Sequence, residues 1–163
     1  MAELTNLETK VAEVIGLAQA AQGATEKIEK LVEDNELKQT LARMRDEAKQ
    51  TEERTTTVVE KFDGKKTAIL EKARETKQEA TEMMRTYLGG DADGLDGFEF
   101  LTMAEAGEVG HWEVLGTMNE RAGNPDLQEV IRWATPIQER HFAEAKGGSL
   151  RLAAAEDPNE PAE

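Results

Sequence analysis

The residues of this chain best suited to chemistry are its two histidines and the glutamates spaced three positions from them. His111 follows Glu108 by three residues, and Glu144 follows His141 by three. Residues three apart share one face of an α-helix, so each histidine would lie beside one glutamate. Imidazole nitrogens and carboxylate oxygens are ligands that iron, manganese and zinc accept. Glu108, His111, His141 and Glu144 are therefore candidate metal ligands.

Other kinds of catalytic site find little support. The chain has no cysteine, which excludes thiolate metal sites, disulfides and cysteine nucleophiles. It also lacks a glycine-rich phosphate loop and a G-x-S-x-G turn. Glu108 and His141 could exchange a proton, but acid–base catalysis also needs a substrate cavity. Whether the protein is an enzyme stays open; if it is one, metal-dependent redox or peroxide chemistry is the expected class.

The amino-acid composition limits which fold classes and which binding partners are expected. The chain has 163 residues, of which 4% are aromatic, and a formal net charge of −14. A chain of this length forms about one domain, and this composition is typical of long helices. The negative charge would repel nucleic acid, so we expect no such partner. No apolar run is long enough to span a membrane and no signal peptide is visible, so we expect a cytoplasmic location.

Five helical segments must position the candidate residues. Apolar or small residues recur at alternating spacings of three and four in the stretches 4–32, 37–62, 69–87, 101–122 and 127–152. Turn signals separate the stretches, and short links make neighbouring helices antiparallel. These features predict an all-α fold, an antiparallel four-helix bundle with an additional helix in the central crossover, spanning residues 1–154. Residues 155–163 read as a disordered acidic tail, and "GGDADGLDG" (89–97) as an irregular exposed loop.

The predicted buried stripes of the first two helices carry no charged residue or histidine, whereas those of the last two carry Glu108, His111 and His141, so both histidines should lie inside. If these helices form a hairpin, Glu108 lies opposite His141, and His111 lies opposite Gln138. Two helical pairs would then face one another, which is the arrangement of half a metal site. The alternative is a metal-free polar network, in which Glu108 bonds to His141 and Gln138 holds His111.

The first two helices do not supply the ligands for the other half of a metal site. They contain no histidine, and their nearest acidic residues lie beside the predicted stripe, reaching the interior only if the helical register differs from the prediction: Glu13, Asp46, Glu47 and Glu53. A ferritin-like dinuclear site would need one carboxylate and one Glu-x-x-His pair from each half of the bundle. The prediction is therefore a partial iron, manganese or zinc site, or none.

The order of motifs resembles the YciF-like branch of the ferritin-like superfamily, which comprises small stress-associated helical proteins of bacteria and archaea. Four stretches between about residues 35 and 146 carry the resemblance: "NELKQTL", "FDGKKTAILEKA", "EVGHWEVLGTMNERAG" and "NPDLQEVIRWATPIQERHFAEAK". The resemblance implies a ferritin-like bundle, often dimeric. It implies no particular substrate.

The chain departs from the family's ligand pattern. Where the family typically has Glu-His-aromatic-Glu in the third long helix, this chain has Gly110 before His111, so only the histidine carries over. In the last helix, Glu139 alone matches the family's acidic run. In the second helix, Glu47 alone survives. These departures favour a degenerate or partial site.

The stripes of the first two helices are rich in alanine and threonine, so the outer faces of this hairpin could meet a second subunit. We therefore expect a homodimer formed through the long N-terminal hairpin. The competing interpretation is a structural or protein-interaction bundle without metal, in which the same hairpin docks on another helix.

Overall fold

The computed structural model describes residues 2–162, which form helices and no strands. The helices are α1 Asn6–Glu29, α2 Asn35–Val59, α3 Lys66–Tyr87, α4 Gly94–Ala122 and α5 Pro125–Ala155. This confirms the prediction of an all-α bundle. None of these helices combines the length and the apolar character that crossing a membrane would require.

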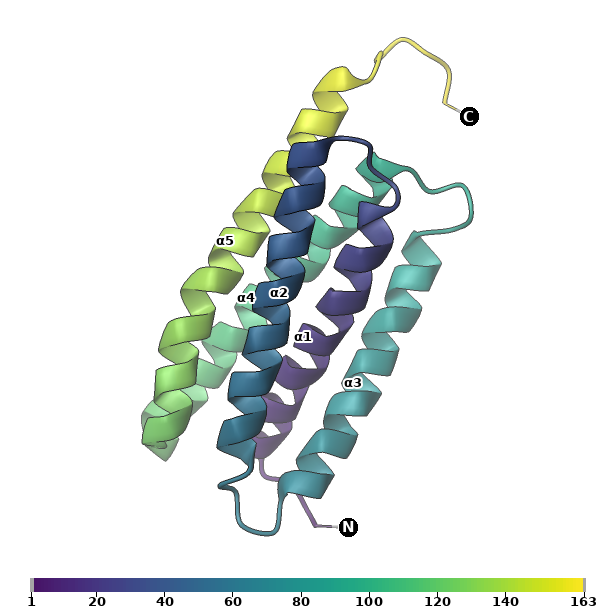
Figure 1. Cartoon of the computed structure of the whole chain (residues 1–163). Helices are drawn as coiled ribbons and strands as arrows, with labels where there is room; N and C mark the ends of the chain where they lie inside the picture. Colours follow the sequence, from purple (N-terminus) through teal and green to yellow (C-terminus); the bar gives the residue numbers. More distant parts are fainter. Residues whose placement is uncertain (1, 163) are drawn as a thin grey trace.

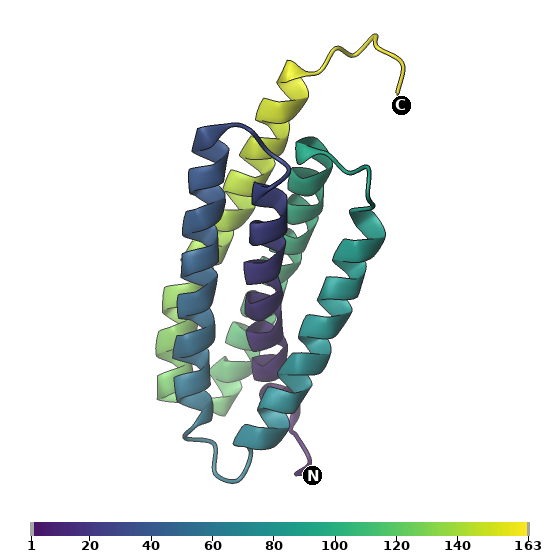
Figure 2. The same ribbon diagram turned by 45° about the vertical axis from the view of Figure 1, so that its right-hand side comes forward.

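Four helices enclose the centre of the molecule and the fifth lies outside them. α1 packs on α2 and α4, and α5 packs on α4 and α2, so these four close a ring. α3 packs mainly on α1 and occupies the crossover between α2 and α4 (Figure 1). The C-terminal end of α3 leans away from α1 (Figure 2).

Capping residues set where the helices begin and end. Thr5 and Glu8 form a capping box at the start of α1, and Asp93 and Asp96 form another at the start of α4. Gly123 adopts the left-handed conformation that closes α4, with φ of 65°. The prediction of an irregular loop through residue 97 is therefore wrong in part, because α4 already begins at Gly94.

The buried stripes of α2 and α5 match the prediction, whereas that of α4 matches it only at Leu101, Glu108 and Leu115. On α4 the buried side chains include Glu105, Trp112 and Asn119, where the sequence pattern suggested Ala104, His111 and Met118. Either set, taken together with Leu101, Glu108 and Leu115, alternates spacings of three and four. The observed set differs by one residue, because it places Trp112, which is 1% exposed, inside the bundle.

Only part of α3 is packed. Ala68, Ile69 and Ala73 are buried, whereas Met83 and Tyr87, near the other end, are 53% and 60% exposed. α5 ends at Ala155, and residues 156–162 of the predicted tail lie outside the helices and are exposed. Residue 163 lies outside the described residues.

Candidate functional site

His141 lies in the bundle interior between two carboxylates. Its side chain is 2% exposed, its Nε2 atom lies 3.4 Å from Oε1 of Glu47, and its Nδ1 atom lies 3.8 Å from Oε2 of Glu105. Glu47 comes from α2 and Glu105 from α4, so the imidazole of α5 links three helices. Burial lowers the pKa of His141, although the charge of Glu47 opposes this shift. The ring is therefore neutral at neutral pH.

Glu105 is a buried carboxyl group that holds its proton. It is 1% exposed and accepts a hydrogen bond from the Gln138 side chain. Burial raises its pKa to about 8, and the negative charge of Glu144 adds to the shift, while the bond from Gln138 opposes it. At pH 7 this carboxyl group is therefore mostly protonated, and it lies beside a neutral imidazole.

A ring of four charged side chains lies between α2 and α5, outside His141. Arg43 donates to Oε1 of Glu144 at 2.7 Å, and its Nε atom lies 3.9 Å from Glu47. Arg140 bonds to Glu47, and its Nε atom lies 3.7 Å from Glu144. Burial alone would raise the pKa of Glu47, but the bond from Arg140 and the charge of His141 outweigh it, and the pKa is lowered. Each carboxylate thus faces two guanidinium groups.

His111 belongs to a different cluster. Its Nδ1 atom lies 3.3 Å from Glu13 and 3.4 Å from Lys10, both on α1. Its side chain is 38% exposed. Burial and the Lys10 charge lower the pKa of His111, against the opposing effect of Glu13. The prediction that both histidines lie inside is right for His141 and wrong for His111, because α4 buries Trp112 in place of His111.

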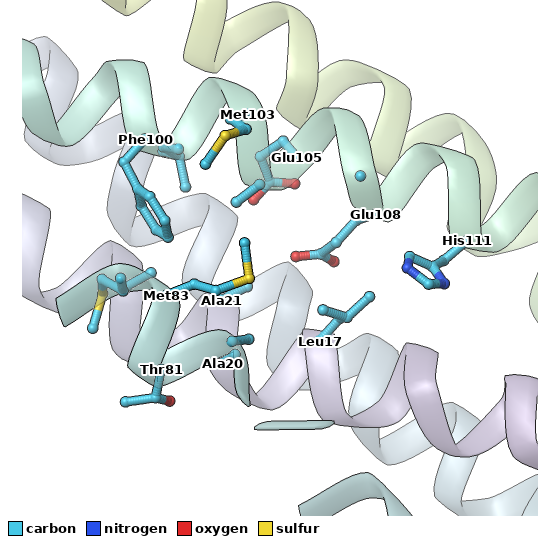
Figure 3. Close-up of a pocket in the computed structure, with 16 residues that line it drawn as sticks. Leu17, Ala20, Ala21, Thr81, Met83, Phe100, Met103, Glu105, Glu108 and His111 are labelled. Carbon is cyan, nitrogen blue, oxygen red and sulfur yellow. The ribbon is translucent and has the colours of Figure 1, made fainter. Parts of the chain in front are cut away.

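Glu108 is buried and has no polar partner. It is 5% exposed, and none of the hydrogen bonds or ion pairs among residues 2–162 involves its carboxyl group. Burial raises its pKa well above 4.5, and the charge of Glu105 raises it further. The carboxyl group points into a cavity between α1, α3 and α4 (Figure 3).

The four predicted ligands are therefore divided among separate environments. Glu108 faces the cavity, His111 contacts α1, His141 lies in the interior, and Glu144 joins the ring of charges. The predicted partners also differ, because Glu105 takes the place of Glu108 beside His141, and Gln138 bonds to Glu105 instead of His111.

As they are placed, these side chains do not converge on one ion. Ligand atoms must converge on one point, but Glu47 and Glu105 lie at opposite nitrogens of His141, and an ion bound to one nitrogen could not reach both. Among residues 2–162, no three histidine or acidic side chains are placed to share an ion. What the groups can do as placed is hold and exchange protons, because the pKa of Glu105 is raised to about 8 and that of His141 is lowered from 6.5.

Sequence reasoning missed Glu105, Arg43 and Arg140. Glu105 lies one turn before Glu108, so a stripe drawn through Trp112 would have included it. The two arginines lie four positions before Glu47 and before Glu144, a spacing that favours ion pairs on a helix. Glu13 and Glu47 were identified as acids able to reach inward if the register shifted, and both do contact a histidine.

Comparison with known proteins yields no match to any family model, to any curated protein or to any solved structure.

Proposed function

We propose that this chain is a ferritin-like bundle without a central metal ion, in which Glu105 and His141 form a buried polar network. Its role would then be that of a structural or protein-interaction bundle. The ring formed by Arg43, Glu47, Arg140 and Glu144 is the observation that carries the proposal. Two guanidinium groups already neutralise Glu144 and Glu47, the carboxylate that contacts His141, so a divalent cation would have to displace them.

The ferritin-like part of the proposal is supported by the path of the chain. α1 and α2 form one antiparallel hairpin, α4 and α5 form the other, and α3 carries the crossover between them. The resemblance to YciF-like proteins belongs to the same proposal, as do a role in a stress response and a cytoplasmic location. Metal binding through Glu108, His111, His141 and Glu144 is the competing proposal, and it would require these side chains to move together.

Metal analysis of the purified protein separates the two proposals. From cells grown with iron, manganese and zinc, we expect the wild-type protein to carry far less than one ion per chain. About one bound ion per chain, lost when His111→Ala and His141→Ala are combined, would overturn the metal-free proposal.

Removing the guanidinium groups tests the role of the ring itself. The double variant Arg43→Gln, Arg140→Gln leaves Glu47, Glu144 and His141 without their cations, so we expect its affinity for Mn²⁺ or Zn²⁺ to rise about tenfold or more over wild type, equal to about 1.4 kcal/mol. Titration calorimetry measures this. Arg151→Gln is the matched control, because Arg151 pairs with Asp34 and Glu36 elsewhere. Equal affinities in all three proteins would contradict the proposed role.

We also propose a homodimer, formed through the α2 side of the N-terminal hairpin and not through the whole hairpin. α3 covers α1, so the outward face of α2 is the part of the N-terminal hairpin that a second copy could meet. The mass in solution, measured by light scattering, tests whether the dimer exists.

A further inference from the structure

A cavity of about 200 Å³ lies between α1, α3 and α4. Its walls are mostly alanine, methionine and other apolar side chains: Leu17, Ala20, Ala21 and Ala24 of α1, Ala80, Met83 and Met84 of α3, and Phe100, Leu101, Met103 and Ala104 of α4. An engineered apolar cavity of ~150 Å³ is large enough to bind benzene. This cavity therefore has room for a ligand of about six carbons.

The Glu108 carboxyl group gives the cavity a polar end. Figure 3 shows it directed into the space between α4 and α1, close to Leu17. It is 5% exposed and, within residues 2–162, no protein group pairs with it. A buried carboxyl group without a partner costs free energy, so evolution ordinarily provides one. Here the missing partner would have to come from outside the chain.

The charges around the cavity select the head group of that partner. The lining residues of α1 and α3 include no titratable group, and those of α4 contribute Glu105, Glu108 and His111. Lys10, whose ammonium group lies 3.4 Å from Nδ1 of His111, is already engaged with Glu13. The cavity wall offers no cation to balance an anionic head group, so burying such a group there would cost free energy. A neutral hydroxyl could form only one ordinary hydrogen bond, whereas an ammonium group would gain a charge-assisted bond.

We propose that this cavity binds a small lipophilic primary amine, with its ammonium group bonded to Glu108 and its hydrocarbon part between α1 and α3. The entrance fits such a ligand, because Met83 and Met103 at the cavity are 53% and 41% exposed. Methionine side chains adapt readily to hydrocarbon of varied shape. This inference does not depend on whether the ring of charges binds metal.

Binding should release a proton. Burial and the charge of Glu105 raise the pKa of Glu108, which favours the protonated carboxyl group in the free protein. An alkylamine resembles the lysine side chain, with a pKa of about 10.4, and arrives already protonated. As the ammonium–carboxylate bond forms, the Glu108 proton passes to the buffer, so about one proton leaves per amine bound.

Calorimetric titration of the full chain with three six-carbon probes tests the proposal. We expect hexylamine to bind at least about tenfold more tightly than hexan-1-ol, and hexanoate to show no binding. Titrations in buffers of different ionisation enthalpy should detect the released proton for hexylamine alone. Equal affinity for the amine and the alcohol, or tight binding of hexanoate, would overturn the proposal.

Substitution of one atom in the site provides the matched variant. Glu108→Gln keeps the shape of the side chain and should lower hexylamine affinity to that of hexan-1-ol, while hexan-1-ol binding is unchanged. Glu113→Gln, an exposed position on the same helix, makes the same change in net charge and should bind hexylamine as wild type does. Unchanged hexylamine binding in Glu108→Gln would refute the assignment.

A measurement on the wild-type protein keeps the test independent of variant folding. With methyl-labelled methionine, NMR signals of Met83, Met84 and Met103 should shift on addition of hexylamine. Met44 and Met118 lie outside the cavity lining, so their signals should not shift. Shifts at Met44 or Met118 without shifts at the cavity would place the amine elsewhere and contradict the proposal.

Discussion

Glu105 gives the interior a dependence on pH that opposes the usual behaviour of an acidic residue. Its pKa is about 8 in the folded protein, against an ordinary value of 4.5. Between these two pH values the unfolded chain has lost this proton and the folded chain keeps it, so the folded state loses stability as pH rises. A carboxylate paired with a cation would show the opposite trend.

Glu105→Gln should therefore stabilise the protein above neutral pH. The amide introduced by this substitution cannot ionise, but its oxygen can still accept the bond from Gln138. We expect the stability difference between variant and wild type to grow from about pH 4.5 to about pH 8, reaching on the order of 1–3 kcal/mol. Urea unfolding at pH 5 and pH 8 measures this difference. Glu113→Gln, which is exposed, should show no such trend, and the same trend in both variants would contradict the prediction.

Close contact between α1 and α3 depends on a glycine. A Cβ atom on Gly16 would lie 2.7 Å from Cβ of Thr76 and closer still to the carbonyl oxygen of Ala73. Real Cβ atoms do not approach other atoms this closely, so one helix would have to move. The absence of a side chain at Gly16 therefore sets how closely α3 can approach α1.

Gly16→Ala should destabilise the protein by about 1–3 kcal/mol, because α3 must shift away from α1. Gly23→Ala is the matched control on the same helix, because a Cβ atom there has no neighbour within 4 Å. It should stabilise the protein by about 0.5–1 kcal/mol through helix propensity alone. Thermal unfolding of both variants tests the contrast, and similar effects of the two would argue against the close contact.

The hydrophobic periodicity of the sequence predicted the buried residues correctly on helices that bury only one face. The stripes of α2 and α5 were placed correctly because each presents one face to the ring. Half of the α4 stripe was displaced by one residue, since Ala104, His111 and Met118 repeat at the same spacing as Glu105, Trp112 and Asn119. That displacement misplaced His111 and hid Glu105. The pairing of His141 with Glu47 depends on packing between helices 94 residues apart in sequence, which no local pattern reports.

The molecule as a whole carries a large excess of negative charge. With a net charge of −14, the folded chain repels itself more than the expanded chain does. Salt shortens the range of this repulsion, from ~10 Å at 0.1 M to ~3 Å at 1 M. The folded state should therefore gain stability from added salt.

Raising KCl from about 0.1 to about 1 M should raise the melting temperature. The expected rise is roughly 2–4 °C for each kcal/mol by which the free energy of unfolding increases. The combined variant Glu79→Gln, Glu113→Gln, Glu120→Gln removes three exposed charges and should respond less to salt. Calorimetric scans of both proteins measure the responses. A melting temperature that falls with added KCl, or an equal response in both, would show that surface repulsion is not the dominant charge effect.

The central position of α1 has a consequence for the order in which the molecule opens. α1 packs against α2, α3 and α4, and its Val11, Ala12 and Ile15 are fully buried. The second half of α3 is exposed and covers little of its neighbours. Among the helical backbone amides, exchange with deuterium should therefore occur first in residues 80–87 and last in the middle of α1. α1 should thus exchange its amide hydrogens after the four helices that follow it.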